Sequence, residues 1–285
     1  MNRPLACAVA LVIATGLAGC ATTPPAHADN DKTAMPAPAA QDNPFFAEST
    51  LPLKYPAFDK IKDSDFGPAF DRGMADQLKE VAAIADNAEP ATFDNTIVAL
   101  EKSGQVLGRA ATVFFNLTGA DTNDTREKLQ GDYAAKLSAH SDAISLNPKL
   151  FARIKSLYDN RQSLGLKAEG VRLIERYYTD FVRAGANLTE AQKARIKDIN
   201  SELATLGTKF NQNVLAEVNA AAVVVDTKAE LAGLSDGQIA AAAEAAKTRK
   251  LEGKYVIALL NTTGQPTLTQ LENRALRERV YKASI

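Results

Sequence analysis

Hydrophobic residues recur every three or four positions through most of the chain after residue 65, the spacing of one buried face on an α-helix. The first such segment, about 65–86, carries Phe66, Phe70, Met74, Leu78, Val81 and Ile84. Comparable segments follow at about 93–117 and 124–146, from Asn147–Pro148 toward Gly165, over 171–185, and from Thr189 through Val214. The pattern predicts a mostly all-α fold made of several amphipathic helices.

Helix-start and helix-stop residues support these boundaries. Thr189 with Gln192 forms a capping box, and Asp124 with Glu127 resembles one. Gly185 follows the segment at 171–185, where glycine commonly ends a helix.

Two glycines interrupt the apolar pattern of the segment at 93–117, which otherwise predicts one continuous helix. Gly104 lies on the apolar face and Gly108 lies beside it. Each glycine costs about 1 kcal/mol relative to alanine inside a helix. We therefore expect a close helix crossing at this point, and a flexible hinge is the less favoured alternative.

The longest predicted helix begins at Thr189. Its apolar positions alternate steps of three and four and comprise Ile196, Ile199, Leu203, Leu206, Phe210 and Val214. At 1.5 Å per residue this helix would run roughly 40 Å. We expect it to form one wall of a large helical domain, its apolar face covered by the shorter helices; a free coiled coil is the competing interpretation.

Two β-rich pieces follow, Ala222–Asp226 and Lys254–Leu260. They are predicted to pair as a small antiparallel ribbon around a helix at 235–247. The last predicted helix starts near Leu268 and reaches Ile285 with no glycine or asparagine stop signal after it. Because the pattern is interrupted in mid-helix, we expect the domain to be truncated.

The first residues have the features of a secretion signal. Met1-Asn2-Arg3 precedes an apolar run from Leu5 to Leu17 that is too short to span a membrane, so residues 1–19 are predicted to be a signal peptide. Leu17-Ala18-Gly19-Cys20 resembles the bacterial lipobox, which makes Cys20 the expected lipidation site and the membrane a partner through that anchor. Ala21 fits sorting to the outer membrane, with the protein facing the periplasm. Simple secretion to the periplasm after cleavage at Ala28 is the alternative.

Residues 20–43 are rich in alanine and proline and lack large apolar residues except Met35, so they are predicted to be a tether between the lipid and the folded region at 44–285. Cys7 would leave with the signal and Cys20 would carry lipid. No disulfide is therefore expected in the mature protein.

Composition narrows the functional classes. The 285 residues hold 33 Lys plus Arg against 34 Asp plus Glu, so nucleic acid is not expected as a partner. The two histidines, His27 and His140, cannot supply the paired imidazoles of an H-E-x-x-H zinc site. His27 lies in the tether. His140 lies on the apolar face of its helix, where a hydrogen-bonded core position is the expected role.

Catalytic motifs are absent from the sequence. The chain has no glycine-rich phosphate loop and no G-x-S-x-G nucleophile motif. The segment beginning Asp121-Thr122-Asn123 starts like a calcium loop but has Arg126 where glycine is required. No catalytic residue and no metal ligand is therefore assigned.

Several segments, taken in order, are similar to the thimet-oligopeptidase-like zinc metallopeptidases, and most of all to the bacterial peptidyl-dipeptidases (dipeptidyl carboxypeptidases). They are Asn43–Phe46, Ser49–Pro52, Phe58–Ile61, Phe93–Ile97, Val113–Leu117, Arg176–Tyr178, Phe181–Gly185, Asn261–Thr263 and Asn273–Glu278. The resemblance covers residues 43–285.

The resemblance implies a mostly helical, clam-like protein of the neurolysin type, with a deep channel between two halves. It also implies one zinc ion, held by the two histidines of H-E-x-x-H and a downstream glutamate, and short peptides as substrates. None of those catalytic residues has a counterpart here. The chain corresponds to the N-terminal helical part, and no zinc is expected to bind to it.

Two functional hypotheses follow. In the first, the chain is the N-terminal portion of a lipid-anchored dipeptidyl carboxypeptidase, forms part of the channel wall, is inactive alone, and has the missing catalytic half as its partner. In the second, it is a short non-catalytic helical lipoprotein that binds peptides or a partner protein. The first hypothesis also predicts an exposed apolar patch where the missing half would dock.

Overall fold

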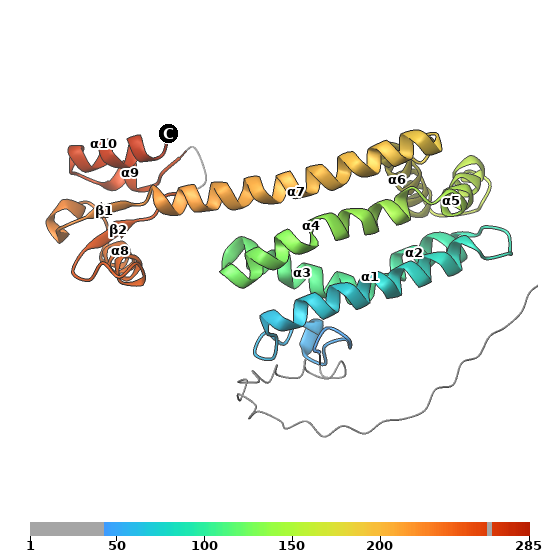
Figure 1. Cartoon of the computed structure of the whole chain (residues 1–285), viewed down its shortest axis with the longest axis horizontal. Helices are drawn as coiled ribbons and strands as arrows, with labels where there is room; N and C mark the ends of the chain where they lie inside the picture. Colours follow the sequence, from blue (N-terminus) through green and yellow to red (C-terminus); the bar gives the residue numbers. More distant parts are fainter. Residues whose placement is uncertain (1–42, 261–263) are drawn as a thin grey trace, which may run out of the picture. The chain divides into compact units, whose positions relative to one another are not determined.

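The structure, a computed structural model, describes residues 43–260 and 264–285, which form one compact unit. Helices dominate this unit, in agreement with the predicted mostly all-α class (Figure 1). They are α1 Asp63–Ala85, α2 Ala99–Lys102, α3 Gln105–Ala120, α4 Asp124–Ser145, α5 Pro148–Asn160, α6 Ala168–Ala184, α7 Glu190–Ala220, α8 Asp236–Thr248, α9 Thr267–Gln270 and α10 Arg274–Ala283. Short turns of 3₁₀-helix at Pro52–Lys54 and Lys228–Leu231 complete the helical elements, together with a π-helix at Phe93–Val98.

The predicted β ribbon is present and antiparallel. Strand β1, Val223–Val225, pairs with β2, Tyr255–Ile257, and Val224 lies opposite Val256. Helix α8 packs against β2, and α10 lies against β1. Buried apolar residues of the ribbon, α8 and α10 share one core, which includes Val225, Ile257, Ala242 and Leu276.

The capping box predicted at Thr189 is confirmed. The Thr189 hydroxyl accepts a hydrogen bond from the Gln192 N–H, and the Gln192 side chain accepts one from the Thr189 N–H at 3.0 Å. Gly185 ends α6 in a left-handed conformation, with φ of 108°. The start of α4 differs from the prediction, because the capping residue is Asn123, one position before Asp124.

The prediction of one continuous helix over 93–117 is wrong. The π-helix and α2 end at Lys102, and α3 starts after Gly104, which adopts a left-handed conformation with φ of 71°. The Gly104 N–H donates to the Glu80 carboxylate at 2.7 Å, so α1 supplies the acceptor for the first turn of α3. A residue with a Cβ is disfavoured here both by this φ and by the Gln77 side chain, which would lie 2.4 Å away.

A close helix crossing does exist, but at a glycine of α1. A Cβ on Gly73 would lie 2.6 Å from the backbone nitrogen of Leu107 in α3, whereas a Cβ on Gly108 would meet nothing within 4 Å. The expected crossing at Gly104 and Gly108 is therefore corrected: Gly73 allows α1 and α3 to pack together, and Gly108 faces open space.

An aromatic core lies between the first half of α1 and helices α3 and α4. The Phe114 ring lies 5.1 Å from the Phe66 ring and 5.2 Å from the Phe70 ring, both edge-on. Phe45, which precedes α1, joins the same core. This packing attaches the segment at 43–62 to the helices.

A second core joins the last turns of α1 with the π-helix, α5 and α6. A buried guanidinium borders it: Arg153 of α5 donates to the carbonyls of Asn87 and Glu89 at 2.8 and 2.9 Å and to the Asn95 side chain at 2.8 Å. Arg153 thereby positions the connection between α1 and the π-helix.

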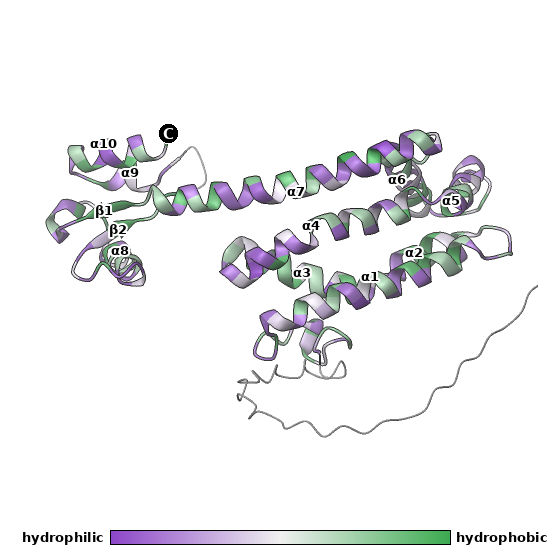
Figure 2. Ribbon diagram, viewed as in Figure 1, coloured by the Kyte–Doolittle hydropathy of each residue, from purple (hydrophilic) through white to green (hydrophobic). Residues whose placement is uncertain are grey.

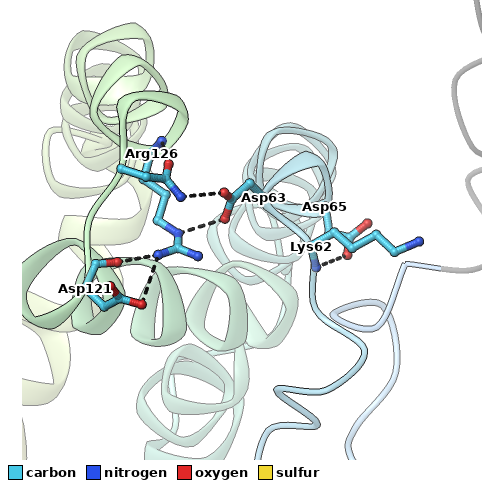
Figure 3. A network of polar contacts seen from close by, with 6 residues as sticks. Lys62, Asp63, Asp65, Asp121 and Arg126 are labelled. Atoms are coloured by element: carbon cyan, nitrogen blue, oxygen red, sulfur yellow. Dashed lines mark hydrogen bonds and ion pairs between the residues drawn. The ribbon is translucent and has the colours of Figure 1, made fainter. Parts of the chain in front are cut away.

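Polar contacts connect the start of α1 to the start of α4 (Figure 3). Arg126 donates from Nε to the Asp63 carboxylate at 2.7 Å and also binds the Asp121 carbonyl. Asn123 donates to the other Asp63 oxygen at 2.8 Å. On the other side of the same turn, the Asp65 carboxylate accepts from the Lys62 N–H. A carboxylate is favourable in the first turn of a helix, which carries unpaired N–H groups.

Helix α7 packs along α4 through polar residues. Asn200 donates to the Asp142 carboxylate at 2.7 Å, and Gln212 donates to the Glu127 carbonyl at 2.8 Å. None of the helices within residues 43–260 and 264–285 is long and apolar enough to cross a lipid bilayer.

Candidate functional site

Cys20, the predicted lipidation site, lies outside the described residues, as do His27 and the tether up to residue 42. The sequence predicted no catalytic residue and no metal ligand, so there is no predicted set of site residues to locate in the structure. The candidate sites are accordingly features that the fold itself creates.

His140 occupies the predicted core position. Its side chain is 8% exposed, and Nε2 lies 2.7 Å from the Gln77 Oε1 atom. Because an amide oxygen only accepts, the neutral imidazole carries its proton on Nε2. Burial lowers the pKa of His140 from its ordinary value. Gln77 also donates to the Ser103 hydroxyl, so this histidine is part of the packing between α1, α4 and the break before α3.

Metal-binding side chains are not gathered into a site in the described ranges. No group of three or more histidine, cysteine, aspartate or glutamate side chains within residues 43–260 and 264–285 is arranged to hold a metal ion. The carboxylates at the start of α1 are instead bound by Arg126 and by backbone N–H groups.

A cavity of about 720 Å³ lies between the segment at 44–61 and α3. Gly108 and Thr112 of α3 line it from one side, and Phe45, Leu51 and Ile61 line it from the other. Its size and mostly apolar lining are typical of sites for small molecules or for inserted side chains.

Two polar contacts accompany this cavity. Arg109 donates from Nε and Nη2 to the Phe45 carbonyl, at 3.1 and 2.9 Å, and so holds the first segment against α3. Lys54 and Glu48 form an exposed ion pair at 3.0 Å. Among the described residues that line the cavity there are hydroxyl groups but no histidine that could act as a base for them.

The sequence did not predict this cavity. The glycines Gly104 and Gly108 were the only related feature of the sequence, and they were interpreted as a helix crossing. Gly108 instead leaves the floor of the cavity open. The cavity also requires the segment at 44–61 to lie opposite α3, and no local sequence pattern specifies that position.

The second candidate is an apolar surface on α7. Leu203, Leu206 and Phe210 are 61%, 54% and 67% exposed, and we call these three residues the α7 ridge. Their steps of three and four place them on one side of the helix. The prediction that shorter helices cover this face is wrong for these three residues, whereas Ile196, Ile199 and Val214 of the same stripe are half-buried. Figure 2 shows hydrophobic residues recurring along α7, although its polar residues make the contacts with α4.

These features describe a helical region with a cavity beside α3 and an exposed apolar face on α7. In comparisons with known proteins, no family model matches the chain. The chain is 46% identical over 241 residues to dipeptidyl carboxypeptidase of Escherichia coli (strain K12), a match that covers 85% of this chain and 35% of that protein. It is 45% identical over 242 residues to dipeptidyl carboxypeptidase of Salmonella typhimurium, which covers 85% of this chain and 36% of that protein.

A more distant relative is oligopeptidase A of Escherichia coli, 26% identical over 232 residues and matched over 34% of its length. Over the matched residues the chain is therefore related to the dipeptidyl carboxypeptidase and oligopeptidase A family, as the resemblance in its sequence indicated. It spans about a third of the length of the curated relatives it matches.

Proposed function

We propose that this chain is the N-terminal portion of a lipid-anchored zinc metallopeptidase of the dipeptidyl carboxypeptidase type, and that it forms part of the wall of the peptide channel. The observation that carries the proposal is the 46% identity to dipeptidyl carboxypeptidase over 241 residues. Similarity at this level, continuous over 85% of the chain, favours a shared fold and parentage over isolated motif matches.

In this proposal the chain contributes structure and no chemistry. Zinc would supply Lewis-acid activation of water in the complete peptidase. The described residues do not fit a zinc ion, because they contain no ligand cluster and the imidazole of His140 is buried against Gln77. No step of peptide hydrolysis is assigned to this chain, and short peptides are substrates of the complete protein.

The proposal places the folded region at the periplasmic face of the outer membrane. The lipobox-like sequence ending at Cys20 supports lipid anchoring, and the proline-rich residues that follow support a tether. Metabolic labelling with a fatty acid tests this part, since replacing Cys20 by serine should abolish incorporation. Labelling that persists in the Cys20→Ser variant would contradict it.

Sequencing the gene beyond codon 285 tests the parentage. We expect a reading frame, continuous or restored by one frameshift, that encodes an H-E-x-x-H segment. An immediate stop codon, together with a purified chain that is monomeric and unfolds cooperatively, would instead support a short lipoprotein that binds peptides or a partner protein.

The purified chain itself provides a second test. It should bind no stoichiometric zinc and should release no dipeptides from short peptides. Peptidase activity that co-purifies with the chain and disappears with a chelator would overturn the assignment of a non-catalytic role.

A further inference from the structure

Helix α7 leaves Leu203, Leu206 and Phe210 exposed, although Ile196, Ile199 and Val214 of the same apolar stripe are half-buried. The polar side chains of Asn200 and Gln212 make hydrogen bonds to α4. All residues of α7 are described by the structure, and among them only Lys193 is buried. The α7 ridge faces solvent. In a surface helix of a monomer the apolar face is the buried one, and each large apolar side chain contributes roughly 1.5–3 kcal/mol when it is removed from water.

A glycine beside the ridge points the same way. Gly207 lies between Leu206 and Phe210 in the helix interior, and a Cβ at this position would meet nothing within 4 Å. Such a glycine costs about 1 kcal/mol relative to alanine. Within the described residues nothing packs against it, so a neighbouring backbone has room to approach closely here.

We propose that the α7 ridge is the docking surface for the catalytic portion of the same peptidase, supplied by the part of the family's polypeptide that this chain does not match. The inference rests on the proposed function and adds the surface at which the two portions meet. The chain spans about a third of its relatives, so most of the family polypeptide is available as the occupant. The partner surface should be apolar, because the ridge and its neighbours Ile199 and Val214 carry no charge.

A second copy of this chain is the less favourable occupant. Stable association of two separate proteins usually buries about 800 Å² on each partner. Three partly exposed side chains supply a small fraction of that area. An apolar area of this size is more typical of a contact inside one larger fold. There, further contacts and the covalent connection between the portions reduce the entropy that is lost on association.

Thiol labelling tests the proposal, because Cys7 and Cys20 are the only cysteines in the chain. With both replaced by serine, Phe210→Cys is made in the 285-residue chain and in a hybrid that continues after Ile285 with the unmatched remainder of Escherichia coli dipeptidyl carboxypeptidase. The matched control is Thr205→Cys, an exposed position on another side of α7. A hybrid without the added cysteine corrects for thiols of the relative.

We expect maleimide to label Phe210→Cys rapidly in the isolated chain and at least about tenfold more slowly in the hybrid, because coverage limits access to the thiol. Thr205→Cys should label equally in both. Equal labelling of Phe210→Cys in the two proteins overturns the docking proposal when the hybrid releases dipeptides and is therefore folded. Protection in the isolated chain that increases with its concentration also overturns it, because the occupant is then a second copy.

Release of dipeptides from a short peptide by the hybrid separates the two proposals. Protection of the ridge in a hybrid without activity supports docking and contradicts the proposed function. Activity without protection supports the proposed function and contradicts docking. If both hold, Leu203→Gln with Leu206→Gln should reduce hybrid activity and leave the unfolding of the isolated chain unchanged, since these side chains are exposed there.

Discussion

Gly73 of α1 packs directly against the backbone of Leu107 in α3, where a Cβ on the glycine would lie 2.6 Å from the leucine nitrogen and 2.7 Å from its Cα. Backbone atoms cannot rotate away as the end of a side chain can. The two helices must therefore separate to admit even one methyl group, and the aromatic core around Phe70 and Phe114 would separate with them.

Gly73→Ala is expected to destabilise the protein by about 1–3 kcal/mol, the usual cost of overpacking a core. Gly108→Ala is the matched control in the partner helix, because a Cβ there meets nothing within 4 Å. This second change should stabilise the chain by up to about 1 kcal/mol through helix propensity. Urea unfolding of both variants measures the difference, and equal free energies of unfolding would refute the close crossing.

Arg153 is expected to be irreplaceable by lysine. Its buried guanidinium donates hydrogen bonds to two backbone carbonyls, to the Asn95 amide oxygen and to the Thr96 hydroxyl. The ammonium group of lysine cannot reproduce the planar arrangement of these donors. Arg153→Lys should therefore cost about 1–3 kcal/mol, because the buried Thr96 hydroxyl and the partly buried oxygens lose donors.

Lys155→Ala provides the comparison for Arg153 on the same helix. Lys155 pairs with Asp159 at 2.6 Å in an exposed position, so the midpoint of thermal unfolding should stay unchanged. An Arg153→Lys variant as stable as the parent in calorimetry would show that the buried contacts contribute little.

The sequence predicted helices well because their apolar periodicity is a local property of the chain. The capping boxes and the Gly185 stop are local as well. The break at Gly104 was missed because the apolar spacing continues across it, whereas the break depends on Glu80 and Gln77 of another helix.

The candidate sites were harder to predict from the sequence, because they too depend on contacts between distant segments. The stripe on α7 was correctly recognised as apolar, yet periodicity cannot tell what covers a face, and the structure leaves the ridge exposed. The cavity beside Gly108 and the buried position of Arg153 both depend on contacts between segments far apart in the chain, such as that of Arg109 with Phe45, separated by 64 residues. Such contacts have no signature in a single sequence.

The contact between Asp63 and Arg126 should contribute measurably to stability, since their side chains are only 26% and 16% exposed. A double-mutant cycle with Asp63→Asn and Arg126→Gln is expected to give a coupling energy of about 1–2 kcal/mol. The exposed pair Lys128 and Asp132 in the same helix is the control, and its coupling should be below about 0.5 kcal/mol. Equal coupling in the two cycles would mean that the partial burial of the first pair has no energetic effect.

Stability should fall as the solution is acidified below the ordinary pKa of histidine, about 6.5. Burial lowers the pKa of His140 in the folded state, so the unfolded chain takes up this proton first, and acid favours unfolding. Above that pH the imidazole is neutral in both states and contributes no pH dependence. Protonation would also place a second N–H on Nδ1, which is buried and has no hydrogen-bond partner among residues 43–260 and 264–285.

His140→Gln isolates this effect, because glutamine keeps a donor for Gln77 but does not titrate. The parent should lose more thermal stability than the variant between about pH 7.5 and about pH 5.5, a range in which most carboxylates remain ionised. Calorimetry at both pH values measures the loss. Identical losses in the two proteins would show that His140 titrates alike in the folded and unfolded states, and would contradict the lowering of its pKa by burial.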